Sequence, residues 1–306
     1  MMPRVAIIIL NWNGLTDTLE CLESLAHLDY PNYEVVVVDN GSTDGSVEAI
    51  QKHFPDVALI ENDQNLGYAE GNNRGVEYAL QAGIDYVFVL NNDTVLCQDI
   101  LNRLVVVAEA HPRVGAVGPK IYYNAQPRRI WFAGGVIDWQ RGVTVNLGAG
   151  EDDVGQFEQV RSVDFLAGCA LLIKREAWKD VGSFDSRFFM YWEEVDWCTR
   201  AQRAGYGLLF VPQAKMWHKI SPADQSYSPR ILYYMTRNRL LFLHKNLLFP
   251  RKVIVLARCI WDVCRTIAGF LRCGKRMQAG ALTRGALDFF RGRFGQASTI
   301  SGKDFA

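Results

Sequence analysis

The chain has 306 residues, of which 49% are hydrophobic and 22% charged, and this composition predicts a globular protein with one large or two smaller domains. Its seven cysteines are odd in number and include no Cys-x-x-Cys pair, so neither a disulfide framework nor a zinc site is indicated and a reducing cytoplasm is expected. The apolar run before Asn11 is too short for a secretory signal and is typical of a buried strand.

The net charge of zero hides an uneven distribution. Residues 228–306 contain 15 Lys and Arg against 3 Asp and Glu, whereas residues 1–227 contain 18 against 30. The C-terminal region therefore carries +12 and predicts an anionic partner, either phospholipid or nucleic acid. No nucleic-acid recognition motif accompanies this charge, which disfavours the second choice.

Strands and helices alternate through the first part of the chain. Each apolar strand is followed by a helix whose apolar residues share one face, as do Leu15, Leu19, Leu22 and Leu25. Such alternation predicts an α/β fold with a mostly parallel sheet and right-handed connections. The predicted strands cover residues 4–10, 35–38, 57–60, 87–93 and 114–117, and the intervening helices lie near residues 15–25, 47–54, 79–80 and 100–108.

The pattern changes after residue 120. Residues 121–150 are short, aromatic and glycine-rich pieces that predict a β-hairpin excursion. A strand and a helix follow within 163–178, then an aromatic loop that enters a helix ending near Gly205, and a last core strand at 207–212.

Beyond Pro229 the chain is predicted to be helical. The run 253–271 approaches the length of a membrane span, but Arg258, Asp262 and Arg265 interrupt it, and charges at the centre of a bilayer are costly. We therefore expect an amphipathic helix at a membrane interface. A helix that packs on its own domain or on a second subunit fits the pattern equally well.

Asp93 ends the fourth predicted strand, at the edge where open α/β sheets bind ligands. A carboxylate there could hold a magnesium or manganese ion against a diphosphate, although Asp and Asn after a strand also serve as turn formers and helix caps. His218 follows the last core strand and could complete the metal site, while an isolated histidine is more often structural.

Asp39 and a loop after the third strand are candidates for nucleotide binding. Asp39, within VVVVDNGSTDGS, could accept a hydrogen bond from the imide N–H of uracil or thymine, or could cap the next helix. The amides around Asn65, Gly67 and Asn72 or Asn73 could approach a nucleotide closely or simply form a turn. No Gly-x-Gly-x-x-Gly or P-loop motif is present, which argues against NAD binding and ATP hydrolysis.

Three carboxylates lie within four positions at the predicted start of a helix: Glu193, Glu194 and Asp196. The helix dipole favours one or two acids there, but three exceed what capping requires. Neighbouring aromatic residues would desolvate such a carboxylate and raise its pKa, which suits a general base.

Taken together, these motifs resemble glycosyltransferase family 2, the inverting GT-A transferases, and within it the bacterial rhamnosyltransferase-like branch. The likeness covers about residues 5–218 and rests on IIILNWNG, VVVVDNGSTDGS, NLGYAEGNNRG, LNNDT, AGCALLIKREAW and GSFDSRFFMYWEEVDWCTRA. It implies a GT-A-type, Rossmann-like sheet with helices on both faces, a catalytic domain over 1–227 with halves near 1–120 and 121–227, and a basic helical extension over 228–306.

The resemblance also implies roles for single residues. Glu194 would be the catalytic base, and Asp93 with His218 would bind a divalent cation, Mg²⁺ or Mn²⁺. Two positions depart from the family pattern: Asn91 replaces the first aspartate of the Asp-x-Asp motif, and Glu194 replaces an aspartate, so Glu193 or Asp196 could serve instead. The implied nucleotide-binding set is Asn11, Asn13, Asp39, Asn65, Gly67, Asn72 and Asn92.

By the same resemblance, the chain would transfer a sugar from a dTDP-rhamnose or UDP-sugar type donor, with inversion, to a hydroxyl of a glycan or lipid-linked acceptor in cell-surface polysaccharide synthesis. We expect it in the cytoplasm, with peripheral contact to the inner membrane or a homo-oligomer formed through the C-terminal helices. A non-catalytic nucleotide-binding or membrane scaffold and a nucleotidyltransferase are the alternatives, although NWNGLTDTLE lacks the phosphate loop of the latter.

Overall fold

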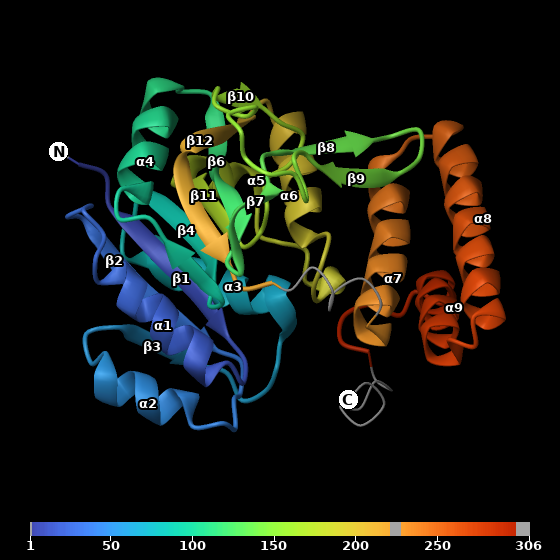
Figure 1. Ribbon diagram of the computed structural model, residues 1–306, viewed down its shortest axis with the longest axis horizontal. Coiled ribbons are helices and arrows are strands. Elements are labelled where there is room, and N and C mark those ends of the chain that lie inside the picture. Colours follow the sequence, from blue (N-terminus) through green and yellow to red (C-terminus); the bar gives the residue numbers. More distant parts are fainter. Residues whose placement is uncertain (1, 221–227, 298–306) are drawn as a thin grey trace.

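The computed structural model describes residues 2–220 and 228–297 and contains one large mixed sheet with a two-stranded hairpin beside it (Figure 1). The strand order in the sheet is β10-β12-β6-β11-β4-β1-β2-β3, with β5 paired to β12 and β7 paired to β6. The strands are β1 (Val5–Asn11), β2 (Tyr33–Asp39), β3 (Ala58–Glu61), β4 (Tyr86–Asn91), β5 (Thr94–Leu96), β6 (Val114–Tyr123), β7 (Gln126–Phe132), β8 (Gly135–Asp138), β9 (Val143–Asn146), β10 (Arg161–Ser162), β11 (Ala170–Lys174) and β12 (Gly207–His218).

Helices cover both faces of the sheet, as expected from the alternating pattern. In Figure 1, α1, α2 and α4 lie in the left half of the view, and α5 and α6 lie to the right of β11. The helices are α1 (Leu15–Leu25), α2 (Ser46–His53), α3 (Gly67–Gln81), α4 (Ile100–Ala110), α5 (Arg175–Val181), α6 (Glu193–Arg203), α7 (Pro229–Asn246), α8 (Arg251–Arg272) and α9 (Arg276–Phe290), with a 3₁₀ turn, η1, at Ser186–Phe188.

The register of the parallel strands aligns their polar ends. β1 pairs with β2 and with β4, so that Asn11 lies opposite Asp39, and Leu10 lies opposite Asn91. Most apolar residues of these strands are fully buried, which fixes the register because a shift by one residue would turn every side chain to the other face. The polar residues that follow each strand are therefore gathered at one edge of the sheet.

Strand β11 departs from the parallel pattern. It runs antiparallel between β4 and β6, so the sheet is parallel from β4 to β3 and mixed beyond it. Strand β12 is longer than the predicted 207–212 and reaches His218, where it pairs antiparallel with β5. Because β5 begins directly after Asp93, this pairing brings His218 to Asp93.

Two further segments differ from the sequence prediction. Helix α3 begins at Gly67, so Asn72 and Asn73 lie inside a helix rather than in the loop that we predicted. The hairpin expected within 121–150 is present as β8 and β9, but β7 joins the main sheet through β6. Glycine and asparagine favour turns, but the tertiary context of α3 overrides this local propensity.

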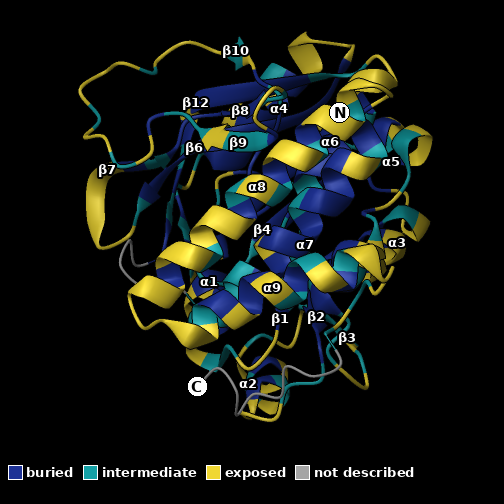
Figure 2. Cartoon of the chain, turned by 90° about the vertical axis from the view of Figure 1, so that its right-hand side faces the viewer, coloured by how far each residue is buried: buried dark blue, intermediate teal, exposed yellow. Residues whose placement is uncertain are grey.

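The C-terminal helices form a separate group in the view of Figure 1, beside the β8–β9 hairpin. Leu240, Phe242 and Leu243 of α7 belong to the main hydrophobic core, and Figure 2 shows α7 largely buried behind α8. α8 buries Val255 and Cys259 and leaves its opposite side exposed. The predicted packing of this helix on its own chain therefore accounts for one of its faces.

In the described part of the chain, no helix is both long enough and apolar enough to cross a bilayer. The domain boundary at residue 228 stays a prediction.

Candidate active site

Asn11 links the ends of three strands. Its amide nitrogen donates to Asp39 Oδ2 at 2.7 Å, and its Oδ1 accepts from Thr18 Oγ at 2.9 Å and from Asn92 Nδ2 at 3.3 Å. Asn11 is fully buried. These contacts support a positioning role in which Asn11 orients Asp39 and Asn92, while direct contact with a nucleoside stays a prediction.

Asp39 and Asn13 shape the loops beside this link. Asp39 Oδ1 accepts from the backbone N–H of Ser42 at 2.8 Å, the turn-forming role that the sequence left open. Asn13 is exposed, has φ of 51°, and accepts from the Thr43 N–H at 2.8 Å. The two loops after β1 and β2 are thus tied together at the sheet edge.

The predicted residues after β3 have different surroundings. Asn65 Oδ1 accepts from the N–H of Gly67 at 2.8 Å. Asn72 is fully buried and its Nδ2 donates to the Tyr68 carbonyl at 2.8 Å, whereas its Oδ1 has no partner within the described residues. Asn73 is bound on both sides to the Phe184 backbone at 3.0 Å, which favours Asn72 over Asn73 as the residue free to act on a ligand.

Asp93 and His218 form the predicted pair. Asp93 Oδ1 lies 2.9 Å from His218 Nε2. Burial opposes ionisation of Asp93, but the hydrogen bond and charge of His218 prevail and hold its pKa below the usual value. His218 Nδ1 is buried without a partner within the described residues, and the edge of its ring contacts Trp131 with centroids 5.1 Å apart.

The pair supplies one carboxylate and one imidazole, which are ligands suited to a divalent cation. Asn91 Nδ2 lies 3.5 Å from His218 Nε2, so the position that would hold a second carboxylate holds an amide. Within residues 2–220 and 228–297, no three His, Cys, Asp or Glu side chains gather into a metal-binding group. A cation there would need further oxygen ligands from a diphosphate or from water.

Glu194, at the second position of α6, has the properties of a general base. Its Oε2 is buried without a partner in the described residues, and burial raises the pKa of Glu194 to about 7. Burial and the adjacent Glu194 raise the pKa of Glu193 well above its usual value, so Glu193 holds its proton more firmly. Of the two carboxyls, Glu194 is the one that can ionise near neutral pH.

Asp196 does not share these properties. It is fully buried and accepts from Arg200 Nε at 2.9 Å, from Lys245 Nζ at 2.8 Å and from Asn246 Nδ2 at 3.0 Å. A carboxylate whose oxygens already accept from three donors is held in place and has little capacity left to accept a hydrogen bond from a substrate hydroxyl. The geometry therefore favours Glu194 over Asp196.

Glu194 and Asp93 both raise the pKa of one buried thiol, that of Cys169. Burial, followed by the charges of Asp93 and Glu194, raises the pKa of Cys169 well above its usual value. The carbonyl of Cys169 accepts from the Asn91 N–H at 3.1 Å, and a side chain at Gly168 would contact Glu194 at 3.4 Å. The antiparallel β4–β11 pairing therefore brings the two candidate sites together.

The sequence reasoning missed Tyr68, Gly168 and Cys169. The Tyr68 hydroxyl donates to the Gly168 carbonyl at 2.8 Å, and burial together with nearby carboxylates, Glu193 foremost, raises the pKa of Tyr68 well above its usual value. Tyr68 lies in the motif NLGYAEGNNRG, but only the fold brings its hydroxyl to Gly168, beside the carboxylates.

Residues 6–182 match the family model for glycosyl transferase family 2. The chain belongs to this family. Because the model matches more than half of the chain, the family-2 resemblance of the sequence motifs is confirmed.

Two family-2 relatives are named rhamnosyltransferases. The N-acetylglucosaminyl-diphospho-decaprenol L-rhamnosyltransferase of Mycobacterium tuberculosis is 34% identical over 205 residues, which cover 60% of this chain and 66% of that protein. The dTDP-rhamnosyl transferase RfbF of Shigella flexneri is 23% identical over 268 residues, covering 80% and 82%. The alignment spans just under two thirds of the mycobacterial protein, and relatives with rhamnosyltransferase names match the chain, as the resemblance implied.

The family-2 fold also matches a solved structure. The mannosyltransferase PcManGT from Pyrobaculum calidifontis, in complex with GDP-Man and Mn²⁺, superimposes with a TM-score of 0.60 at 20% identity, covering 95% of this chain and 88% of that one. This similarity confirms the expected GT-A-type α/β fold with C-terminal helices.

Proposed function

We propose that this family-2 chain transfers a sugar, with inversion, from a nucleoside diphosphate sugar to an acceptor hydroxyl. The observation that carries the proposal is the Glu194 carboxyl, which is buried, unpartnered at Oε2 and has a pKa of about 7. It stands near the edge of the sheet where Asp93 and His218 meet.

In the proposed reaction, Glu194 removes the proton from the acceptor hydroxyl. The resulting oxygen nucleophile attacks the anomeric carbon from the face opposite the diphosphate, and the bond from that carbon to the phosphate oxygen breaks with both electrons. One base is sufficient for this inverting displacement. Retention would need a second carboxylate beneath the sugar as nucleophile, and Asp196 is already held by its three donors.

Asp93 and His218 would hold a divalent cation, which supplies positive charge to the departing diphosphate. His218 Nε2, which lies 2.9 Å from Asp93 Oδ1, and the lowered pKa of Asp93 fit this use, since a ligand carboxylate must be ionised. The Asn11, Asp39 and Asn92 network would position the nucleoside end of the donor.

For the substrates, we propose a dTDP-rhamnose type donor and a lipid-linked acceptor. The names of the two relatives support this choice, one specifying a dTDP-rhamnosyl transferase and the other a diphospho-decaprenol acceptor. A lipid-linked acceptor would place the reaction in cell-surface polysaccharide synthesis, at the cytoplasmic face of a membrane.

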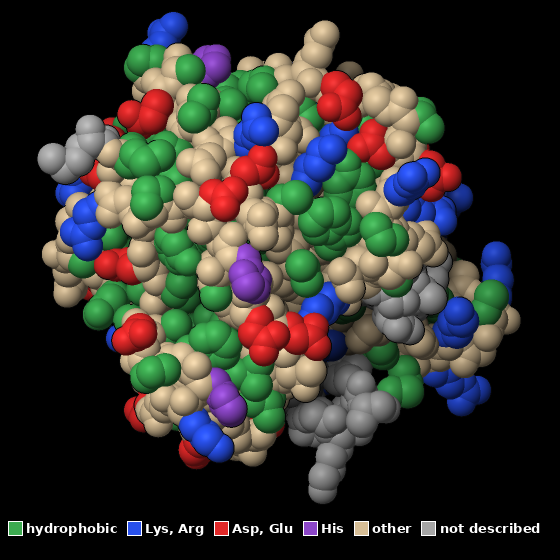
Figure 3. All heavy atoms as spheres, turned by 60° about the vertical axis from the view of Figure 1, so that its left-hand side comes forward, with side chains coloured by type: hydrophobic (Ala, Val, Ile, Leu, Met, Phe, Trp, Pro, Cys, Tyr) green, Lys and Arg blue, Asp and Glu red, His purple; other side chains and the backbone are tan. Residues whose placement is uncertain are grey.

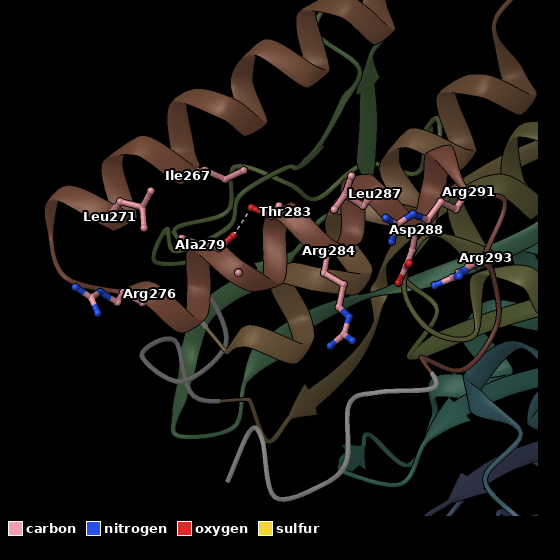
Figure 4. A pocket seen from close by; sticks show the side chains of 11 residues that line it. Ile267, Leu271, Arg276, Ala279, Thr283, Arg284, Leu287, Asp288, Arg291 and Arg293 are labelled. Carbon is pink, nitrogen blue, oxygen red and sulfur yellow. Dashed lines mark hydrogen bonds between the residues drawn. The ribbon is translucent and has the colours of Figure 1, made fainter.

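The C-terminal helices support contact with an anionic membrane surface. α8 exposes apolar side chains, including Ile254 at 67% and Trp261 at 65%, and Figure 3 shows Lys and Arg without acidic neighbours at the lower right edge of its view. A groove of about 570 Å³ between α8 and α9 combines leucines with arginines (Figure 4). Apolar and basic side chains on one surface are the composition that binds anionic lipid. The groove includes Leu271, Leu287, Arg276, Arg291 and Arg293.

Glu194→Gln tests the proposed role. We expect turnover to fall at least about a hundredfold, while donor still raises the melting temperature. Glu193→Gln is the matched control, because the Glu193 carboxyl is also buried but already holds its proton. We expect this variant to retain turnover within about threefold. Wild-type turnover in Glu194→Gln, or loss only in Glu193→Gln, would remove Glu194 from the role of base.

A further inference from the structure

The loop that leads into the catalytic helix has an unusual backbone. Phe189, Tyr191 and Trp192 have φ of 65°, 67° and 76°, a left-handed region that residues with side chains seldom occupy. Trp192 is the residue directly before α6, and Glu193 and Glu194 are the first two residues of that helix. The conformation of this loop therefore sets the direction in which the Glu194 carboxyl points.

The side chain of Asn238, on α7, binds backbone carbonyls of this loop. Its amide nitrogen lies 2.8 Å from the Phe188 carbonyl, 2.7 Å from that of Met190 and 2.9 Å from that of Tyr191. The amide has two hydrogens, so two of the three carbonyls share one of them. Asn238 is fully buried, and its donors point only at the loop.

Arg237 fixes the orientation of that amide. Arg237 Nε donates to Asn238 Oδ1 at 2.9 Å, which assigns the amide nitrogen to the loop side. Arg237 Nη2 donates to the Phe188 carbonyl at 2.9 Å, and Nη1 donates to the Gly295 carbonyl at 2.6 Å. The Arg237 guanidinium, fully buried, thereby joins α7, the loop and the segment after α9.

The opposite side of the loop is held by α3. The Phe189 carbonyl accepts from the N–H groups of Tyr68 and Ala69 of α3 at 2.5 and 3.2 Å. The Phe189 ring, in contrast, stacks on Tyr234 of α7 with centroids 5.3 Å apart. The loop is thus bound between the nucleotide-side helix and α7, so a change at α7 alone alters one of its two supports.

From these contacts we propose that Asn238 and Arg237 are positioning residues for sugar transfer: they hold the loop 188–192, with its three positive-φ residues, in the conformation that aims Glu194 at the acceptor hydroxyl. The inference rests on the proposed role of Glu194 as base. It assigns a function to α7 within the reaction, in addition to its place in the core.

Asn238→Asp tests the proposal with almost no change of shape, because a carboxylate cannot donate to the three carbonyls but can still accept from Arg237. We expect kcat to fall about 10- to 100-fold, since misplacement of a reacting group by about 1 Å has that effect, with KM for the donor changed less than threefold. The apparent pKa in the kcat profile should also move from about 7 toward the ordinary glutamate value as solvent reaches Glu194.

Arg239→Met is the control within the same helix. It removes hydrogen bonds to the carbonyls of Gly142 and Arg141 but leaves the Asn238 amide and its three acceptors in place, so we expect the pH profile of the wild type. Arg237→Lys is the second variant, should Asn238→Asp fold poorly; it removes the Nε bond that orients Asn238, and we expect a smaller loss of kcat with the same direction of pKa change.

A double-mutant cycle separates this inference from the proposed function. If Asn238 acts through Glu194, Asn238→Asp should lower the residual kcat of Glu194→Gln less than twofold. Full additivity, or wild-type kcat and pH profile in both α7 variants, would overturn the positioning role. Wild-type turnover of Glu194→Gln by itself would instead overturn the proposed function.

Discussion

At the scale of the residue, the site depends on how a few buried carboxyls are neutralised. Asp93 meets His218, which holds the pKa of Asp93 below its usual value. Asp196 accepts hydrogen bonds from Arg200 and Lys245. Within the described residues, Glu194 Oε2 has no such donor, and burial raises the pKa of Glu194 to about 7. The same helix start therefore holds one acid fixed by donors and one with an unpartnered oxygen.

The raised pKa of Glu194 predicts how activity depends on pH. A base must be unprotonated, so kcat/KM should fall about tenfold for each pH unit below 7. The measurement is a pH series with saturating cation. A profile flat from pH 5 to 8 would contradict the assignment.

The same shift predicts that Glu194 weakens the fold at alkaline pH. Because its folded pKa lies above the unfolded value of 4.5, the folded state binds the proton more tightly, and stability falls as pH rises from about 4.5 to about 7. Glu194→Gln should therefore melt at least about 2 °C higher than the wild type at pH 8, and the two should converge near pH 4. Equal melting temperatures at pH 8 would show that the carboxyl is not desolvated.

We expect the substitutions Asp93→Asn and Asn91→Asp to have opposite effects on cation binding. The first removes the carboxylate that faces His218, and the second adds one 3.5 Å from the imidazole. We expect Mn²⁺ with a nucleoside diphosphate to stabilise Asn91→Asp at cation concentrations at least about tenfold lower than the wild type, and to stabilise Asp93→Asn only at higher ones. Thermal shift at graded Mn²⁺ measures both, and identical curves would place the cation elsewhere.

At the scale of the element, the start of α3 is fixed by a close contact. Gly67 has φ of 83°, and a Cβ there would lie 2.5 Å from Phe189 Cδ2 and the Phe189 carbonyl oxygen. The helix can begin at this point only because the residue is glycine. Its N–H groups then bind the catalytic loop, so one glycine connects the nucleotide side to the base.

Gly67→Ala should lower the free energy of unfolding by roughly 2–4 kcal/mol, because backbone strain and overpacking add. Gly45→Ala is the matched control, since it has the same φ of 83° but no atom within 4 Å of a Cβ, and about 1–2 kcal/mol is expected there. Urea unfolding of both variants isolates the Phe189 contact, and equal losses would show that the loop yields freely.

At the scale of the whole molecule, the excess of basic residues in the sequence lies in the region of the C-terminal helices. The basic C-terminal region does not stand apart, because α7 is part of the core and binds the catalytic loop. Deletion of this region would remove those contacts as well as the charges. The membrane proposal is therefore better tested by exchanges on the exposed surface of α8 and α9.

Reversing the charge of Arg276 and Arg291 together should release the protein from anionic vesicles. Each basic residue near such a surface contributes about 1 kcal/mol, so we expect the partition coefficient to fall more than about tenfold in flotation with phosphatidylglycerol vesicles, with turnover on a soluble acceptor analogue retained. Neutral vesicles and Trp261→Ser, which removes an exposed apolar side chain, are the comparisons. If Trp261→Ser instead halves the molar mass in solution without affecting flotation, the exposed face belongs to a second copy.

The sequence by itself determined the strands, the helix faces and the motifs at the strand ends, because period-2 and period-3.6 patterns and terminal turn residues are local properties. It also predicted Asp93, His218 and Glu194, which lie in short segments with few alternatives. Only the tertiary structure decided which neighbouring acid is held by donors, since Asp196 accepts from two residues of α7 whereas Glu194 Oε2 has no partner among the described residues. The same holds for Asn238 and Tyr68: their importance comes from contacts across 47 to 50 and 100 positions of chain, and no local pattern encodes such a distance.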